Sequence, residues 1–271
     1  MKDFNGKTVV ITGAGNGIGR QLCILFAKAG ANIVAADIRP DDLAETAGLL
    51  APAVCRSYVL NVSDNEAVEK LAEKVAAQKD GADILINNAG MALGAVKIAD
   101  MRLEELRTVM DVNFWGEVYC TKAFLPQLLA RPEAAIVNMS SIYGITAVAG
   151  SAAYCASKFA VRGFSEALRQ ELRGGPVSLT VVHPGGVRTA IARNAQTPAI
   201  HKSGISREKA EKNFENSART GPLQAAQLIV EAIRAKKPRL LVGSDAKLLD
   251  AIARLRPATY DSFMLKHVAE L

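Results

Sequence analysis

The sequence has few of the residue patterns that build disulfide frameworks, metal clusters or membrane spans. Its 271 residues include four cysteines, at positions 23, 55, 120 and 155, whose spacing matches neither a metal motif nor a disulfide framework. No window reaches about 18 consecutive apolar residues, so we expect no transmembrane helix. The charged start, Met1-Lys-Asp, is unlike a secretory signal. We therefore expect a cytoplasmic protein with reduced thiols and no bound metal.

Features of nucleic-acid-binding and multidomain proteins are also missing. Only 5% of the residues are aromatic, and the net charge of +6 comes from interspersed acidic and basic residues. No aromatic–basic motif accompanies these charges, so we expect no nucleic-acid partner. The sequence has neither an internal repeat nor a linker rich in glycine, serine or proline. Residues 1–271 are therefore expected to form a single domain.

What the sequence does contain is a regular alternation of strand and helix patterns. Short apolar runs, many of them β-branched, predict strands at residues 7–12, 32–36, 57–60, 83–86, 134–139, 178–182 and 239–242. Segments with helical spacing predict helices at residues 20–29, 103–129, 152–172, 222–236 and 246–255. With 49% hydrophobic residues, this alternation predicts an α/β fold: a doubly wound parallel sheet of about seven strands with helices on both faces.

A glycine-rich turn lies between the first strand and the first helix. Residues 13–19 read Gly-Ala-Gly-Asn-Gly-Ile-Gly. Glycines let the backbone approach a pyrophosphate closely, and a helix N-terminus supplies free N–H groups with a partial positive charge. The order of strand, turn and helix favours a phosphate-binding site over a flexible loop.

A tyrosine and a lysine stand four residues apart in Tyr154-Cys-Ala-Ser-Lys158. On a helix this spacing places both side chains on one face. A nearby ammonium favours the phenolate and lowers the pKa of the tyrosine. On its own such a pair is more often a surface contact worth a few tenths of a kcal/mol. A functional pair would make the tyrosine a general acid and base.

Together these segments resemble the short-chain dehydrogenase/reductase family. The family reads Thr-Gly-x-x-x-Gly-x-Gly, here residues 12–19, then Asn-Asn-Ala-Gly, here residues 87–90, and later Tyr-x-x-x-Lys. The match keeps the family's order and spacing over about residues 5–190. The resemblance implies a Rossmann fold, a nicotinamide cofactor and an oxidoreductase activity.

The resemblance also implies four catalytic residues. Family spacing places the catalytic serine 13 residues before the tyrosine, at Ser141, where it would bind the substrate oxygen. Tyr154 would exchange the proton, while Lys158 would lower its pKa and bind the nicotinamide ribose. Asn113 would kink its helix and hold a water that relays the proton. We interpret His183 as structural, since the tyrosine already supplies proton transfer.

The sequence favours NAD over NADP. Asp37 lies 18 residues beyond Gly19, close to the spacing of an acid that binds the adenosine ribose and repels a 2′-phosphate. Asn16 stands where NADP-preferring relatives tend to have a basic residue. Arg39 is the counter-evidence, because an arginine there binds phosphate readily. Asn61 replaces the aspartate that contacts the adenine amine in relatives, and its carbonyl is also an acceptor.

The expected contacts fall into two groups. The cofactor contacts are Gly13, Gly15, Asn16, Gly17, Ile18, Gly19, Asp37, Asn61, Val62, Asn88, Ala89, Gly90, Tyr154, Lys158, Pro184, Gly185, Val187 and Thr189. The substrate contacts are Met91, Leu93, Ile142, Val148 and Ile191. Because the second group is apolar, we expect a hydrophobic or alicyclic secondary alcohol or ketone.

Two rival functions stay open. One is an NADPH-dependent 3-oxoacyl reductase, which Asp37 and Asn16 disfavour. The other is a nucleotide-sensing regulatory protein without turnover, which the complete set of catalytic residues disfavours.

The C-terminal part is less informative. Residues 189–220 are expected to cover the substrate, as in relatives. The helical extension, residues 244–271, is interpreted as a subunit contact, an active-site lid or a weak membrane-surface contact. The resemblance also implies a homodimer or homotetramer formed through helices 103–129 and 152–172.

Overall fold

The computed structural model describes residues 1, 3–78, 81–189, 191, 195 and 218–262. Its strands form one parallel seven-stranded sheet in the order β3-β2-β1-β4-β5-β6-β7. The strands are β1 (Thr8–Thr12), β2 (Asn32–Asp37), β3 (Cys55–Val59), β4 (Ile84–Asn87), β5 (Ala134–Met139), β6 (Val177–Pro184) and β7 (Arg239–Val242). The predicted doubly wound α/β fold is therefore confirmed, and the strand order reverses between β1 and β4.

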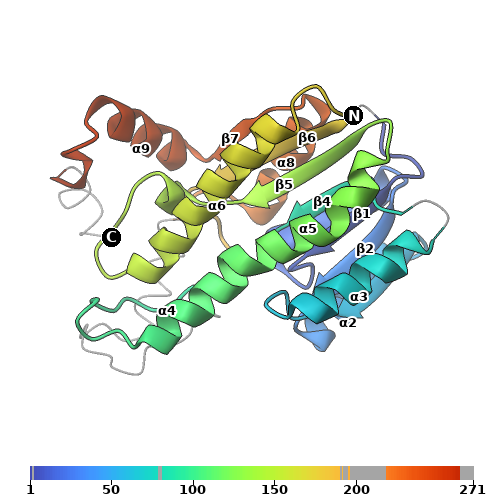
Figure 1. Ribbon diagram of the computed structural model, residues 1–271, viewed down its shortest axis with the longest axis horizontal. Helices are drawn as coiled ribbons and strands as arrows, with labels where there is room; N and C mark the ends of the chain where they lie inside the picture. Colours follow the sequence, from blue (N-terminus) through green and yellow to red (C-terminus); the bar gives the residue numbers. More distant parts are fainter. Residues whose placement is uncertain (2, 79–80, 190, 192–194, 196–217, 263–271) are drawn as a thin grey trace.

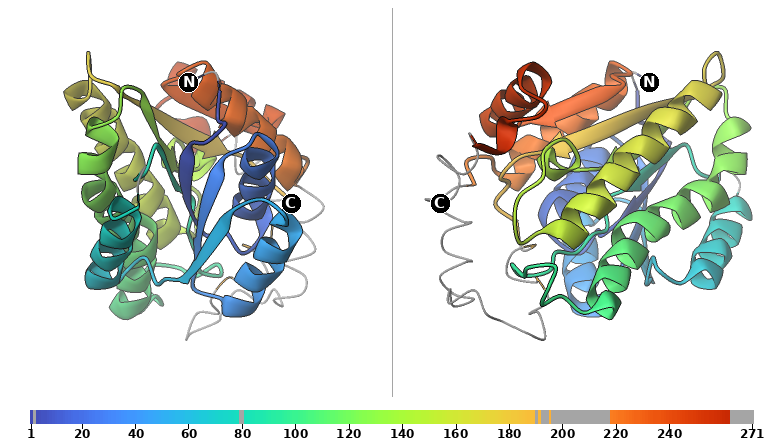
Figure 2. Two further views of the ribbon diagram at one scale, coloured as in Figure 1. Left: turned by 90° about the vertical axis from the view of Figure 1, so that its right-hand side faces the viewer. Right: turned by 60° about the vertical axis from the view of Figure 1, so that its left-hand side comes forward.

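Helices cover both faces of this sheet (Figures 1 and 2). The helices are α1 (Gly17–Lys28), α2 (Pro40–Leu50), α3 (Asn65–Ala76), α4 (Leu103–Met110), α5 (Gly116–Leu129), α6 (Ala152–Glu171), α8 (Pro222–Arg234) and α9 (Ser244–Leu255). One buried cluster joins the sheet to α1, α2 and α8, and a second joins it to α3, α5 and α6. The helix α9 follows β7 at the edge of the molecule (Figure 1).

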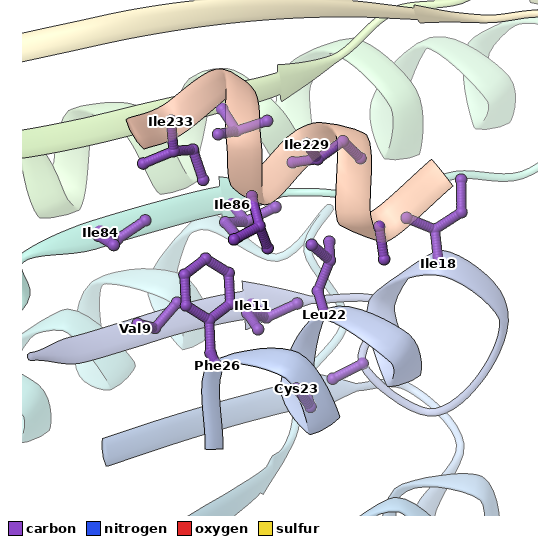
Figure 3. Close-up of a cluster of buried hydrophobic side chains, with 14 of the residues drawn as sticks. Val9, Ile11, Ile18, Leu22, Cys23, Phe26, Ile84, Ile86, Ile229 and Ile233 are labelled. Atoms are coloured by element: carbon purple, nitrogen blue, oxygen red, sulfur yellow. The ribbon is translucent and has the colours of Figure 1, made fainter. Parts of the chain in front are cut away.

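The apolar strand sequences explain why both faces are covered. Side chains alternate across a strand, so Val9 and Ile11 pack toward α1 and α8 while Val10 packs toward α3 and α5. Figure 3 shows the first of these faces, where Phe26 of α1 and Ile229 of α8 lie over β1 and β4. A strand that is apolar on both faces needs a helical layer on each side.

The helix expected over residues 103–129 is interrupted at Asn113, the residue that was expected to kink it. A π-helical segment, Asp111–Trp115, separates α4 from α5. It contains Asn113, whose side chain donates to the Met91 carbonyl oxygen at 3.0 Å and accepts from the Met91 N–H at 2.8 Å. The Asn113 amide group thus bonds to the Met91 backbone through both its oxygen and its nitrogen. These two bonds hold the turn in the wider π geometry, which is common at functional sites.

Two expected regions lie largely outside the described residues. Within 189–220 the structure describes positions 189, 191, 195 and 218–220, so the expected substrate cover is not described as a whole. Within the extension 244–271, α9 is as predicted, and positions 263–271 are not described. Among the helices that the structure describes, none is both long enough and apolar enough to cross a membrane.

Candidate active site

The glycine-rich loop links β1 to α1 at the point where the strand order reverses, which is where ligands bind in open parallel sheets. Gly13 and Gly17 have φ angles of +64° and +54°, a backbone region that residues with a side chain rarely adopt. A Cβ atom on Gly19 would overlap the Gly13 carbonyl oxygen. Asn16 precedes α1, and its side chain makes no capping hydrogen bond to the first N–H groups of the helix. The loop therefore suits a close-lying phosphate.

The segment after β4 holds this loop in place. The Thr12 hydroxyl accepts hydrogen bonds from the backbone N–H groups of Asn88 and Ala89, both at 3.1 Å. The Asn88 amide donates to the Thr12 and Gly13 carbonyls, each at 3.0 Å. The predicted cofactor residues on β1 and β4 are therefore brought together. Thr12, the first residue of the glycine motif, therefore connects β1 to the segment after β4.

Asp37 ends β2 beside the glycine loop. Its carboxylate accepts from the Gly15 N–H at 2.8 Å and from the Arg39 N–H at 3.0 Å. Each carboxylate oxygen keeps a free lone pair, which is what two ribose hydroxyls require. Arg39 does not face this position freely, because its Nε lies 3.0 Å from a carboxylate oxygen of Asp42.

The Asn61 side chain makes local hydrogen bonds, and its expected contact with an adenine amine stays a prediction. Its side-chain carbonyl accepts from both the N–H and the hydroxyl of Ser63, at 3.1 and 2.9 Å. The acceptor expected for an adenine amine is therefore engaged in a local turn. Val62, the next residue, is buried and packs against α3 and α5.

Tyr154 and Lys158 share one face of α6, as the spacing predicts. The Lys158 Nζ lies 5.8 Å from the centroid of the Tyr154 ring and donates to the Met139 carbonyl oxygen at 2.8 Å. The expected lowering of the tyrosine pKa is not what the structure gives. Burial raises the pKa of Tyr154 to about 12, and the Ser141 hydrogen bond opposes this only in part. The lysine ammonium is directed to the end of β5 rather than to the phenol oxygen.

Ser141 follows β5, at the carboxyl edge of the sheet. Its hydroxyl accepts from the Tyr143 N–H at 3.1 Å, and its carbonyl oxygen lies 3.0 Å from Nδ1 of His183. His183 is completely buried, and burial lowers its pKa to about 4. A neutral imidazole that donates through Nδ1 to a backbone carbonyl has the structural role expected of it.

Asn113 faces the same site through the π segment. Its amide also donates to the Ser157 hydroxyl at 3.0 Å, and Ser157 in turn donates to the Tyr154 carbonyl at 2.8 Å. A Cβ atom on Gly90 would lie 3.3 Å from the Asn113 Oδ1 and 3.6 Å from the Lys158 Nζ. The structure thus brings Gly90, Asn113 and Lys158 together. Ser157, which sequence reasoning missed, connects the asparagine to the tyrosine helix.

The segment after β6 completes the opposite wall. Thr189 approaches the glycine loop, since a Cβ atom on Gly17 would lie 3.2 Å from its methyl group. Asp245, at the start of α9, accepts from the Gly186 N–H at 2.6 Å. Pro184 ends β6 and Val187 is buried beside it. The predicted residues of this segment therefore adjoin the glycine loop and are tied to α9.

The five predicted substrate residues do not form one pocket among the described residues. Leu93 is buried in a cluster with Val96, Val109 and Ala153. Ile142 is buried in another, with Ile145 and Ala246. Met91, Val148 and Ile191 are partly exposed. Leu93 and Ile142 pack between elements in this structure, and their contact with a substrate stays a prediction.

A buried acid that the sequence interpretation did not single out lies behind the site. Glu117 is 6% exposed, and it stands one helical turn after Asn113. Burial raises its pKa, and the nearby Lys158 charge opposes that rise. Burial in turn lowers the pKa of Lys158, and Glu117 opposes that. The four-residue spacing from Asn113 was the signal that could have identified it.

Comparisons with known proteins agree with this geometry. A family model described as short chain dehydrogenase matches residues 7–199. The oxidoreductase SadH of Mycobacterium tuberculosis is 39% identical over 275 residues, covering 100% of this chain and 98% of SadH. The relationship therefore extends beyond the motif-bearing residues to the C-terminal part.

Solved structures show the same fold with nicotinamide cofactors. A short-chain dehydrogenase/reductase from Burkholderia phymatum in complex with NAD has a TM-score of 0.87 at 30% identity, covering 96% of this chain and 95% of that one. A serine dehydrogenase complexed with NADP⁺ has a TM-score of 0.76 at 29% identity, covering 87% and 94%. Both the sequence relationship and the fold thus lead to one assignment: the chain belongs to the short-chain dehydrogenase/reductase family of oxidoreductases.

Proposed function

We propose that this protein is an NAD-dependent oxidoreductase that interconverts a hydrophobic or alicyclic secondary alcohol and its ketone. The observation that carries the proposal is the meeting of Ser141, Tyr154 and Lys158 at the carboxyl edge of the sheet, across from the glycine loop. A proton-transfer group and a phosphate-binding loop on one edge suit hydride transfer between an alcohol and a nicotinamide.

The residues have distinct roles in the proposed oxidation. When bound, the nicotinamide supplies the hydride acceptor. Tyr154 takes the alcohol proton, and Ser141 donates a hydrogen bond to the same oxygen and stabilises the charge that develops there. Lys158 holds a ribose hydroxyl and supplies positive charge beside the phenol. Since burial raises the pKa of Tyr154 to about 12, that charge is needed to make the phenolate accessible.

Asn113 is proposed to act by position. Its side-chain bonds go to Met91 and Ser157, so the side chain holds two segments of the site together. A water that relays the proton outward would then be held by the backbone of the π segment, near Lys158. This differs from an asparagine amide that binds the water directly.

NAD is the proposed cofactor because two acids stand at the end of the loop. Asp37 presents a carboxylate beside Gly15, and Asp42 neutralises Arg39. A 2′-phosphate would meet the first acid and would have to compete with the second for the arginine. The structural relatives include an NAD complex and an NADP⁺ complex, so a direct comparison of both cofactors is required.

A panel of secondary alcohols tests the proposal. The full-length protein is assayed with NAD and with NADP, and the absorbance of reduced nicotinamide is followed. Turnover of alicyclic or other hydrophobic alcohols with NAD is expected, at higher kcat/KM than with small polar sugars. Best turnover of sugars would overturn the substrate class. Preference for NADPH with 3-oxoacyl thioesters would favour the rival reductase.

If none of the alcohols is turned over, the result would favour a nucleotide-sensing protein. In that case NADH would still bind, as measured by the fluorescence of the reduced nicotinamide. A matched Tyr154→Phe variant would then bind NADH as tightly as the wild type.

We also propose that the protein is cytoplasmic and assembles through α5 and α6. Trp115, which directly precedes α5, is 43% exposed, and Phe159, on α6, is 40% exposed. Large aromatic side chains in this setting are common in interfaces between subunits. Light scattering of the purified protein is expected to give a dimer or tetramer mass, and Trp115→Lys is expected to lower it.

A further inference from the structure

The carboxylate of Asp245 is enclosed by glycine backbone at the start of α9. One of its oxygens accepts a hydrogen bond from the Gly186 N–H at 2.6 Å. A Cβ atom on Gly185 or on Gly243 would overlap this carboxylate. Gly243 also has a φ angle of +100°, which residues with a side chain rarely adopt. Both backbone segments therefore leave room for the acidic side chain only because they lack side chains of their own.

The segment that follows β6 runs between the serine and the glycine loop of the site. Just before this segment, Nδ1 of His183 lies 3.0 Å from the Ser141 carbonyl oxygen. At its other end, a Cβ atom on Gly17 would lie 3.2 Å from the methyl group of Thr189. A cofactor that places its phosphates on the loop and its nicotinamide near the serine must therefore pass along this segment.

Backbone and side-chain bonds hold the segment together. The Gly185 N–H donates to the Val242 carbonyl oxygen at 2.9 Å, and the Arg188 N–H donates to the Thr220 carbonyl oxygen at 3.0 Å. These bonds join backbone groups, so they do not depend on the identity of a side chain. The bond from Asp245 does depend on it, and a substitution can remove it.

The same helix also contacts the turn that follows β5, which begins with the proposed catalytic serine. Ala246 is buried in a cluster with Ile142 and Ile145 of that turn. Beyond the end of α9, the Tyr260 hydroxyl accepts from the Ala147 N–H at 3.1 Å. The helix is thus packed on the serine turn while its first turn holds the segment after β6. It is therefore placed to fix the position of one relative to the other.

We propose that Asp245 is a positioning residue for the nicotinamide half of the cofactor. Its carboxylate fixes the Gly186 N–H, and so it sets the wall that the nicotinamide meets beside Ser141. The inference rests on the proposed use of a nicotinamide cofactor. The adenosine half would meet Asp37 and the glycine loop, which belong to β2 and to the turn between β1 and α1. Binding of that half is therefore expected not to depend on Asp245.

Two ligands separate a positioning role from a general loss of structure. ADP-ribose carries the adenosine and both phosphates of the cofactor but no nicotinamide. In Asp245→Ala, the dissociation constant of NADH is expected to rise about tenfold, as for the loss of one hydrogen bond to a charged group. The dissociation constant of ADP-ribose is expected to stay at the wild-type value. Calorimetric titration measures both, and equal weakening of the two ligands would overturn the inference.

The conservative variant tests whether the hydrogen bond or the charge matters. Asp245→Asn keeps an oxygen that accepts from the Gly186 N–H and removes the negative charge. It is therefore expected to restore most of the NADH affinity that Asp245→Ala loses. An asparagine variant as weak as the alanine variant would overturn the hydrogen bond as the cause.

Turnover gives a separate readout. In Asp245→Ala, kcat/KM for NAD is expected to fall while the KM for the alcohol stays unchanged. If the difference between NADH and ADP-ribose occurs in a protein that oxidises no alcohol, the proposed function fails and the role of Asp245 stands.

A matched control removes an acid from the first turn of another helix. Glu66→Ala deletes an exposed carboxylate of α3 that pairs with Lys70, and it should leave the binding of both ligands unchanged. Asp245→Ser is the second variant if the alanine destabilises the fold, because it keeps a polar side chain that is too short to reach Gly186. Wild-type NADH affinity in folded Asp245→Ala or Asp245→Ser, as judged by their thermal midpoints, would overturn the inference.

Discussion

The two ends of the cofactor crevice differ in how their charges are held. At the Asp37 end, which includes Arg39 and Asp42, each charge stands beside an opposite charge or an N–H donor. At the Tyr154 end, which includes Lys158, Glu117 and His183, the ionisable groups are desolvated and their pKa values move toward the neutral forms. Fixed charges suit recognition, whereas groups that are close to changing charge suit proton transfer.

The largest expected effect comes from removing the proton-transfer group at the Tyr154 end. Tyr154→Phe deletes one hydroxyl and keeps the ring beside Lys158. General acid–base catalysis typically contributes a factor of about 10²–10⁴, so kcat should fall by that factor while NADH binding stays near the wild-type value. Steady-state kinetics with the best alcohol measures the first, and fluorescence titration measures the second. An equal loss in both would place Tyr154 in recognition instead.

The next largest effect is expected at the loop that joins the two ends. Gly19→Ala introduces a methyl group against the Gly13 carbonyl, which is fixed by Asn88. Overpacking of this kind costs about 1–3 kcal/mol, and NADH affinity should fall with it. Gly163→Ala is the matched control, because nothing lies within 4 Å of a Cβ atom there. In the middle of α6 it should raise stability by about 0.5–1 kcal/mol, as measured by urea unfolding. A loss there would indicate that a second copy covers the helix.

A smaller change is expected in cofactor preference at the Asp37 end. Asp42→Asn removes the carboxylate beside Arg39 and leaves the guanidinium free to meet a 2′-phosphate. The ratio of kcat/KM for NADP to that for NAD should rise by about tenfold, equivalent to about 1.4 kcal/mol. The neighbouring exposed acid, as Asp41→Asn, tests whether net charge alone produces the change. Equal ratios in both variants would remove the special role of the pair.

The smallest effect concerns the stability of the Tyr154 end in acid. The folded protein keeps the His183 pKa at about 4, below its ordinary value of 6.5. Between these values the unfolded chain binds a proton here and the folded chain does not, so the free energy of unfolding falls as the pH falls from about 6.5 to about 4. His183→Asn keeps a donor for the Ser141 carbonyl and should flatten this part of the profile. Urea unfolding at several pH values measures it, and an unchanged slope would exclude His183 as its source.

Sequence patterns predicted the sheet and its two helical layers because the strands are apolar on both faces. Val9, Val10 and Ile11 leave no polar face, and glycines mark the turn that follows them. The resemblance placed a kink at Asn113, but its π geometry escaped prediction because one added residue in a turn barely disturbs a 3.6-residue pattern. The packing of Leu93 and Ile142 escaped it because an apolar residue has the same appearance whether it lines a pocket or fills a core.

The finer chemistry of the site depended on distances that a sequence does not contain. Tyr154 and Lys158 were correctly placed on one helix face, but the direction of the ammonium depends on the position of the Met139 carbonyl. The sequence pattern suggests an adenine amine as the donor to the Asn61 side-chain carbonyl, whereas in the structure the Ser63 hydroxyl donates to it. Glu117 was missed because one acid in a helical pattern is usually exposed, and its burial follows from how α5 meets β4 and β5.

The π segment between α4 and α5 changes the rotational register of one helix relative to the other. Each residue of an α-helix turns the chain by about 100°, so one surplus residue in Asp111–Trp115 rotates everything beyond it relative to everything before it. Asn113, inside the segment, bonds to Met91, and Glu117, in the first turn beyond it, is buried. Deleting one residue of the segment would restore an unbroken helix and turn α4 out of step with α5, so we expect a change of length here to disturb the packing of both helices.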